Sequence, residues 1–510
     1  MFNNLLLDID AGTIDWSRAQ FALTAIYHWL FVPLTLGLAV IMGIVETIYY
    51  RTKEQFWKDA AIFWQKLFGI NFAMGVATGI ILEFEFGTNW SNYSWFVGDI
   101  FGAPLAVEGI VAFFMESTFV AVMYFGWKKV SPGFHLASTW LTGLGATISA
   151  WWILVANAWM QYPVGCAFNP DTMRNEMVSF AEVALSPFAI SKFCHTVTSS
   201  WIIGAVFCVG VCSWYMLKRR EPRLSIESMK IGAAVGLVAS LLAAATGHKS
   251  AQDVAAVQPM KLAAMEALYD GGNGIGLKVI EGIEVPNALS FMATNDFEGY
   301  VPGVNNILNG YTTPDGKVEP SVEEKIERGK KAIAALAAYR KAKHEGAEDS
   351  VTSAQLAILT ENMPYFGYGY IRDKSEVVPP IAVNFWAFRI MVGAGCLFIL
   401  FFAIVLAGAY GWPKALWRDR SITGLPNWHY WIAIALIPLA YIASESGWLV
   451  AEFGRQPWTI QDMLPTWAAV SDLQSSSVMI TFFLFLILFT TMLAVEINIM
   501  LKQIKKGPQL

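Results

Sequence analysis

The sequence predicts an all-α, polytopic membrane protein: a bundle of nine transmembrane helices with one long polar loop. The first observation is composition, since 55% of the 510 residues are hydrophobic and 15% are charged. Soluble domains are less apolar and more charged. The second is that several apolar runs exceed about 18 residues, enough to cross a bilayer as a helix. The third is that many of the 21 Trp lie near the ends of these runs, as in the aromatic belts of membrane proteins.

Nine apolar runs are expected to be the spans. The stretch before the first run has no basic region or cleavage site, and is expected to form a short amphipathic segment at the surface. A long polar loop separates the sixth and seventh runs, and its part from 315 to 349, rich in Lys, Glu and Ala, predicts an exposed helix. The chain thus divides into 1–247, 248–380 and 381–510. The approximate spans are 20–49, 60–86, 102–127, 136–160, 187–217, 228–247, 381–410, 428–450 and 477–501.

Basic residues between the runs predict the orientation. Five connecting or terminal stretches on one side hold 16 Lys and Arg, whereas the short stretches on the other side hold only Arg18, Arg174 and Arg455. Because basic residues favour the cytoplasmic side, the N-terminus and the 248–380 loop are expected outside and the C-terminus in the cytoplasm. The basic stretches are 51–58, 128–135, 218–230, 411–427 and 502–510.

Two of the six histidines, His28 and His195, lie inside membrane-length apolar runs. Ionisable side chains are costly at that depth, and no Asp or Glu near His28 on its own helix can pair with it. A neutral imidazole facing the interior of a bundle suits an axial ligand of a metal or haem iron. The alternative is a histidine that only hydrogen-bonds between helices. For His135, His344 and His429, at span ends or in loops, the ordinary structural interpretation is preferred.

Several possible ligands and acids share one depth. His28 and His195 each lie about eight residues into an inward-running span, and Met391 lies about ten residues in, which is roughly 12–15 Å from the outer end. A shared layer beneath the outer loop indicates redox chemistry near the outer surface, although most Met residues only pack. The residues placed in the outer half of the membrane are His28, His195, Met391, Glu108, Glu445 and Glu452.

Glu116 is eight residues deeper than Glu108 on the third span, about 12 Å along the helix. The two carboxyls can line one path, and Ser149 on the next span can extend it. Buried carboxyls of this kind can hand on protons. The alternative is that both are structural partners of Arg or Ser, and Glu445 could likewise only hydrogen-bond within the bundle.

With these residues in place, the chain resembles subunit I of the cytochrome bd-type quinol oxidases over essentially its whole length. The last of the shared motifs is the most specific, because Arg, Gln and Pro side by side at a span's outer end are hard to explain in a generic membrane protein. The motifs are YHWLFVPLTLG (27–37), KLFGINFAMGVATG (66–79), EFGTNWS (85–91), GDIFGAPLAVEG (98–109), FFMESTFV (113–120), ILVANAWMQ (153–161), FCHTV (193–197), QPMKLAAMEA (258–267), FRIMVGAG (388–395) and GWLVAEFGRQPW (447–458).

The resemblance implies three haems. His195 and Met391 match the axial pair of a low-spin haem b, and Arg389 a residue that holds its propionates. His28 matches the axial ligand of one of two high-spin haems, a haem b and a haem d or a further haem b. Glu452 matches a ligand or close neighbour of the other. Trp448 matches an aromatic between the haems.

The resemblance also implies the substrate sites. Lys261 and Glu266 match the quinol-binding part of the outer loop, although by composition alone they would be a solvated pair. Glu108, Glu116 and Ser149 match a proton path to the oxygen site, and Arg455 belongs to the GRQPW signature near the haems. The implied reaction oxidises quinol beneath the outer loop and reduces oxygen to water with cytoplasmic protons, which separates charge without a pump. Glu445 is kept as a further cofactor-site candidate.

The chain departs from relatives at two positions, with Glu85 where some carry Gln and His248 where some carry Asp, and its loop after Glu266 is only loosely similar. A haem–copper oxidase is the rival enzyme, but it needs more intramembrane His than two. A secondary transporter or channel is the rival of another class, and it predicts no haem. The resemblance implies a second large membrane subunit and small single-span subunits in a bacterial inner membrane. No nucleotide motif or nucleic-acid patch is present.

Overall fold

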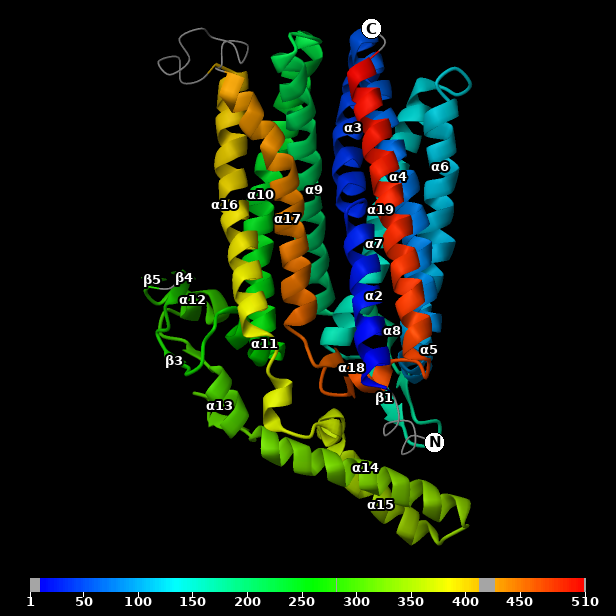
Figure 1. Ribbon diagram of the computed structural model, residues 1–510, viewed down its shortest axis with the longest axis vertical. Helices are drawn as coiled ribbons and strands as arrows, with labels where there is room; N and C mark the ends of the chain where they lie inside the picture. The colour runs from blue at the N-terminus through cyan, green and yellow to red at the C-terminus, as the bar shows by residue number, and fades with distance from the viewer. Residues whose placement is uncertain (1–9, 281, 412–426, 509–510) are drawn as a thin grey trace.

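The computed structural model describes residues 10–280, 282–411 and 427–508. Within these ranges, nine helical segments are long and apolar enough to cross a membrane, which confirms the predicted fold class. Figure 1 shows them side by side, with the elements of the long loop gathered at one end of the bundle. The N-terminal end of the chain lies at the loop end, and the C-terminus lies at the opposite end.

The nine segments follow the predicted runs, with extensions at several ends. The third is interrupted by a π-helix that begins at Glu108, and such insertions often occur at functional sites. In chain order the segments are α2 (Ala11–Trp29) with α3 (Val32–Thr52), α4 (Gln55–Thr88), α5 (Ser91–Val107) with η1 (Glu108–Phe113) and α6 (Phe114–Phe125), α7 (Pro132–Gln161), α8 (Phe180–Ala184) with α9 (Pro187–Leu217), α10 (Pro222–Val257), α16 (Ile381–Ala409), α17 (Asn427–Phe453) and α19 (Ser475–Lys506).

Two boundaries differ from the sequence prediction. Residues 11–19 are not a separate surface segment but the first turns of α2, whose N-terminus is capped by the Asp10 side chain accepting from the Gly12 N–H at 3.3 Å. Residues 1–9 lie outside the described residues. The sixth helix continues past 248 to Val257, and the Lys249–Asp253 ion pair at 2.6 Å has the i,i+4 spacing that supports a helix beyond the apolar core.

The outer loop is a set of short elements, and its longest helix lies inside the stretch predicted to be an exposed helix. That helix, α14, packs against α15 and η2 and projects from the bundle (Figure 1). Lys343 and Tyr339 of α14 both contact the Asp171 carboxylate, at 2.5 and 3.0 Å. The helices outside the spans are α11 (Pro259–Met265), α12 (Ala288–Thr294), α13 (Val304–Asn309), α14 (Val322–His344), α15 (Asp349–Asn362), η2 (Met363–Tyr370), η3 (Lys374–Val377) and α18 (Thr466–Ala469).

Strands occur only as short antiparallel pairs among the described residues, all of them in connecting segments. Four of the pairs join neighbouring stretches of chain, whereas β3 and β6 bring together residues 272–273 and 300–301. The pairs are β1 (Cys166–Asn169) with β2 (Arg174–Met177), β3 (Gly272–Asn273) with β6 (Tyr300–Val301), β4 (Leu277–Ile280) with β5 (Ile283–Val285), β7 (Tyr311–Thr312) with β8 (Val318–Glu319), and β9 (Trp458–Ile460) with β10 (Leu464–Pro465).

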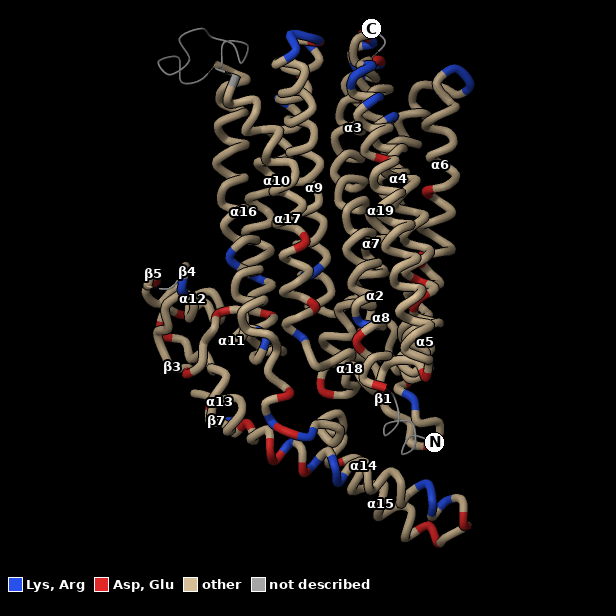
Figure 2. Tube along the Cα trace, in the orientation of Figure 1, with Lys and Arg blue, Asp and Glu red and all other residues tan. Residues whose placement is uncertain are grey.

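Charge is distributed unevenly along the bundle. Figure 2 shows Lys and Arg collected at the end opposite the outer loop, where the turns α3–α4, α6–α7 and α9–α10 and the C-terminus lie. We call this the basic end. The predicted basic stretch 411–427 lies almost wholly outside the described residues.

Helix α9 is the central element, and it packs against α10, α17, α3 and α7. Its contact with α3 depends on two glycines. A Cβ added to Gly204 would lie 2.5 Å from the Gly37 backbone, and one added to Gly37 would lie 2.6 Å from Gly204 Cα. Such close backbone approach is what small residues provide between membrane helices.

We therefore expect Gly204→Ala to lower the free energy of unfolding by about 1–3 kcal/mol, the usual cost of overpacking. The matched control is Gly395→Ala on α16, where an added Cβ meets nothing within 4 Å. Thermal unfolding of the two variants in detergent measures the difference. Equal midpoints would show that the α3–α9 contact can open at little cost.

Candidate functional site

A cavity of about 600 Å³ lies between α2, α4, α7 and α17 and the π-helix segment, and this volume is within the range of cofactor sites. It brings together eight of the residues that the sequence predicted for the site, from four of the membrane-spanning segments and the turn that follows α17. It also contains Glu83 of α4, which the sequence analysis did not select. The predicted residues that line it are His28, Glu108, Glu116, Ser149, Glu445, Trp448, Glu452 and Arg455.

His28 presents one free ring nitrogen to this cavity. Its Nδ1 lies 3.0 Å from Thr78 Oγ1, and that hydroxyl donates to backbone carbonyls of its own helix. The hydroxyl oxygen is therefore the acceptor, and Nδ1 carries the proton. Among the described residues no hydrogen bond engages Nε2, which keeps its lone pair for a ligand. Gly79 lies against the ring, since an added Cβ would be 3.1 Å from Cε1.

The wall opposite His28 is formed by α17 and carries two acidic residues. Glu445 is mostly buried, and its Oε1 has no hydrogen-bond partner among the described residues. One turn away, Trp448 packs edge-on against Trp29 of α2, with ring centroids 5.1 Å apart. Because buried polar atoms are seldom left without partners, the free Glu445 oxygen indicates that the cavity accommodates a further group.

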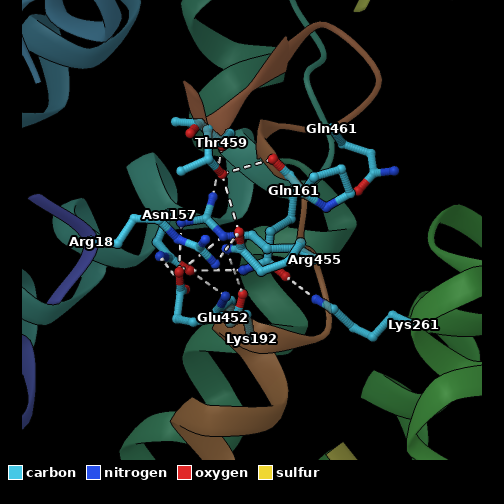
Figure 3. Close-up of polar contacts among 12 residues, drawn as sticks. Arg18, Asn157, Gln161, Lys192, Lys261, Glu452, Arg455, Thr459 and Gln461 are labelled. Carbon is cyan, nitrogen blue, oxygen red and sulfur yellow. Dashed lines mark hydrogen bonds and ion pairs between the residues drawn. The ribbon is translucent and has the colours of Figure 1, made fainter. Parts of the chain in front are cut away.

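Glu452 is the centre of a polar network at the outer end of the cavity (Figure 3). Its Oε2 accepts two bonds from Arg455, at 2.5 and 2.9 Å, and its Oε1 accepts from Asn157 at 3.1 Å. The Asn157 Oδ1 in turn accepts from Lys192 and from Gln161. Three helices of the bundle and the GRQPW turn are thereby joined around one carboxylate.

Lys261 of the outer loop is attached to this same network. It is only 3% exposed, and its Nζ donates to Gln161 Oε1 at 2.6 Å and to Gln258 Oε1 at 2.8 Å (Figure 3). Burial, reinforced by the Lys192 cation, lowers the pKa of Lys261 well below its ordinary value. By composition this lysine would have been solvated, but α11 packs against α10, α16 and α13, and the Lys261 side chain is buried with its ammonium bonded to α7.

Glu266, five residues later, takes a different partner. Its Oε2 accepts from Arg389 Nη2 at 2.6 Å, while its Oε1 has no partner among the described residues. Burial raises the pKa of Glu266 to about 7, against the opposing effect of the Arg389 guanidinium. Arg389 also donates to the carbonyls of Met265 and Lys278. The arginine therefore fastens the loop to α16, and the propionate role remains a prediction.

His195 and Met391 lie outside the cavity, in the part of the bundle formed by α9, α10, α16 and α17. The His195 Nδ1 contacts the Ala243 carbonyl at 3.1 Å, so it carries the proton and Nε2 is left free among the described residues. Glycines flank both side chains. An added Cβ on Gly247 would be 3.0 Å from His195 Cε1, and one on Gly447 would be 3.1 Å from Met391 Sδ.

The structure brings together only some of the residues predicted for the proton path. Ser149 Oγ donates to Glu108 Oε1 at 2.7 Å. Glu116 lies deeper and touches α7 at Gly145, where an added Cβ would be 2.7 Å from its Cγ. Both carboxyls line the cavity, so they face one space.

Three other residues have roles that the sequence analysis did not assign. Lys192 stands three residues before His195 in an apolar run, and an intramembrane lysine is itself a signal of function. Glu85 accepts from Thr24 at 2.5 Å, and this bond braces α4 against α2. His248 contacts Asn295 at 2.8 Å and holds the outer loop to α10.

Nine membrane-length helices among the described residues, and a cavity between several of them with a free imidazole nitrogen and an unpartnered Glu445 oxygen, define an integral membrane protein with an interior site that can accommodate a cofactor. A model of the family described as cytochrome bd terminal oxidase subunit I matches residues 16–508. The chain belongs to this family, which confirms the resemblance seen in its motifs. It is a multi-span membrane protein, and membership implies haem cofactors and a partner subunit.

Individual relatives agree over nearly the whole length. The chain is 40% identical to the cytochrome bd-II ubiquinol oxidase subunit 1 of Escherichia coli (strain K12), covering 97% of each chain. It is 35% identical to the cytochrome bd ubiquinol oxidase subunit 1 of Bacillus subtilis (strain 168), covering 97% of this chain and 94% of the relative. The structure of bd oxidase from Geobacillus thermodenitrificans has the same fold, with a TM-score of 0.76 and 21% identity over 98% of this chain and 100% of that one.

We expect Asn157→Leu to lower the free energy of unfolding by about 1–3 kcal/mol, because it removes the acceptor of Lys192 and the donor to Glu452 Oε1, while Arg455 still holds Oε2. The control is Asn384→Leu on α16, which removes only a bond to the Pro380 carbonyl of its own helix. Thermal unfolding in detergent compares them. A loss no larger than in the control would contradict the central place given to Asn157.

Proposed function

We propose that the chain is the haem-carrying subunit of a quinol:oxygen oxidoreductase, which oxidises a membrane quinol, reduces oxygen to water and separates charge without a pump. The observation that carries this proposal is the free Nε2 of His28 in a cavity that also holds the unpartnered Oε1 of Glu445. The names of the relatives, which are ubiquinol oxidase subunits, support the same reaction.

The residues fit the cofactors that the family implies. His195 and Met391 would hold a low-spin haem b, with Gly247 and Gly447 leaving room beside them. His28 would hold one of two high-spin haems, and Glu452 would hold or adjoin the other. We propose a haem b and a haem d, or a further haem b, for this pair. When bound, the haems supply electron transfer and oxygen reduction.

The charges around Glu452 fit this assignment. Three cationic side chains, Lys192, Lys261 and Arg455, surround one carboxylate in the network of Figure 3. Buried charges need partners of opposite sign. The excess of positive charge fits anionic groups such as the propionates of a haem.

At the outer loop, Glu266 would accept the proton of a quinol hydroxyl. Its Oε1 is free of partners among the described residues, and a pKa of about 7 suits a general base at neutral pH. Arg389 holds the other oxygen in place. Lys261, held by Gln161 and Gln258, would donate a hydrogen bond to the second quinol oxygen.

Protons for oxygen reduction would enter from the cytoplasm and pass by Glu116 to Glu108. The Ser149 hydroxyl, bonded to Glu108, can accept one proton while donating another. Each charge moved across the membrane would store about 2.3 kcal/mol per 100 mV. The separation arises because quinol protons leave at the loop end while these protons enter from the basic end.

We propose that the N-terminus and the loop face outward and the C-terminus faces the cytoplasm of a bacterial inner membrane. The basic end in Figure 2 supports this orientation, since basic residues favour the cytoplasmic side. The family implies a second large subunit. We further propose small single-span subunits and no nucleic-acid partner.

The haem assignment predicts separate spectral losses. In a reduced-minus-oxidised spectrum of the purified complex, His195→Ala and Met391→Ala should each lose the low-spin haem bands and keep the high-spin bands, whereas His28→Ala should lose high-spin absorbance. His248→Ala is the control and should keep all bands. A His195→Ala spectrum equal to that of the wild type would contradict the assignment.

The quinol site predicts a pH dependence. Below pH 7 the Glu266 carboxyl is mostly protonated and cannot accept a proton, so quinol oxidation should rise about tenfold per pH unit and level off above 7. Glu266→Gln should lose this dependence and turn over at least about tenfold more slowly. Glu298→Gln, an exposed carboxyl of the same loop, should keep it. Steady-state oxygen consumption from pH 5.5 to 8.5, about 1.5 units either side of that pKa, measures both.

A further inference from the structure

A second polar cluster lies inside the bundle, toward the basic end and away from the cavity. Its centre is Glu46 of α3 and His135 of α7, which are 1% and 2% exposed. The Glu46 Oε1 and the His135 Nδ1 are 2.6 Å apart. Among the described residues this is the one ion pair between a histidine and a carboxylate. The sequence analysis gave His135 an ordinary structural role because it stands near a span end.

The hydrogen bonds of the pair determine how many protons it holds. The His135 Nε2 lies 3.0 Å from the Met123 carbonyl, which can only accept, so Nε2 carries a hydrogen. A second proton must lie between Nδ1 and Oε1, because two lone pairs would otherwise face each other at 2.6 Å. The pair is therefore neutral overall, and it holds one transferable proton in a buried site.

The rest of the cluster supplies hydrogen-bond donors to the other oxygen of Glu46. Its Oε2 accepts from Thr139 Oγ1 at 2.5 Å and from Gln65 Nε2 at 2.9 Å. The carboxyl thus has three donors around it in a low-dielectric interior, where such bonds are strong. An ordinary packing position in an apolar bundle does not require this many polar groups.

One aromatic side chain separates the pair from the basic end. The Trp127 ring packs against the His135 ring at a tilt of 35°, with centroids 3.9 Å apart, and its Nε1 donates to Gln65 Oε1 at 3.1 Å. The ammonium of Lys58, a residue of the basic end, lies 5.4 Å from the centre of the Trp127 ring. Trp127 is partly exposed, so the cluster lies directly beneath the surface of the basic end.

In the other direction, one face of α7 leads from the pair to the cavity. Thr139 and Thr142 follow His135 at helical spacing, and both are fully buried. Gly145, one turn further, is the point where Glu116 presses against α7. Ser149, which bonds Glu108, lies on the same face, fourteen residues and about 21 Å from His135.

We propose that Glu46 and His135 are the entry station of the proton path: a neutral buried pair that takes up a proton from the basic end and passes one along the Thr139–Thr142 face of α7 to Glu116. A proton taken up at the Glu46 carboxyl leaves from Oε2 to the Thr139 hydroxyl that contacts it, while the shared proton stays between Nδ1 and Oε1, so the pair returns to its neutral starting state. The inference rests on the proposed function, and it names the residues that connect Glu116 to the cytoplasm.

Two substitutions at Glu46 separate this role from a structural one. Glu46→Gln keeps the length and the hydrogen bonds of the side chain but holds no transferable proton. Glu46→Asp keeps the carboxyl but shortens its reach. If the pair only braced α3 against α7, Asp would be the more damaging change. If it carries protons, Gln is the more damaging one.

The measurement is quinol-driven proton uptake from the side of the basic end, with the complete oxidase complex in vesicles. Glu46→Gln should slow uptake and oxygen reduction at least about tenfold, and Glu46→Asp should stay within about threefold of the wild type. Both should keep the full haem spectrum. His135→Asn, which removes the ring nitrogen that shares the proton with Glu46 Oε1, should follow Glu46→Gln.

Ser228→Ala is the matched control, since it removes a buried interhelical bond from Trp64 at the same end of the bundle without removing a titratable group. Two outcomes would overturn the inference alone. One is proton uptake by Glu46→Gln that is no slower than uptake by this control, and the other is uptake by Glu46→Asp that is slower than uptake by Glu46→Gln. A wild-type complex without quinol-driven oxygen consumption overturns the proposed function together with the inference.

Discussion

The need to pair every buried charge is the constraint on which the rest of this structure depends. Inside a bilayer-spanning bundle an isolated ion is costly, so Glu452 is held by Arg455 and Asn157, and Asn157 in turn receives Lys192. These bonds join α17, α7 and α9 at the outer end of the cavity. They bring the side chains of Arg455, Lys192 and Lys261 to one carboxylate, and the propionates of the proposed haems would add anionic partners there.

The outer loop is attached to the bundle by the same principle. Lys261 reaches the Glu452 network through Gln161, and Glu266 reaches α16 through Arg389. Residues five apart in the loop thus contact two different parts of the interior, one beside the His28 cavity and one beside Met391. A quinol held between them would lie next to both. In the proposed function, the loop would therefore supply residues of the quinol site.

Close backbone contacts hold the helices of the bundle together, and the buried polar groups form the candidate functional sites. Gly37 and Gly204 let α3 and α9 approach, and Gly145 lets α7 approach Glu116. The polar face of α7 can be followed from His135 near the basic end to Asn157 and Gln161 at the outer end. One helix thus connects both ends of the proposed proton path with the network around Glu452.

The sequence by itself determined the spans, the shared depth of His28, His195 and Met391, and the family. Hydropathy and motif spacing are local properties, and helix rise converts residue number directly into depth. The sequence did not determine which buried side chains pair with one another. That Lys261 is buried, that Glu266 bonds Arg389, and that His135 meets Glu46 all depend on which faces of separate helices meet. Only the tertiary structure decided these contacts, because pairing across helices depends on rotation and packing, which leave no periodic trace in a single chain.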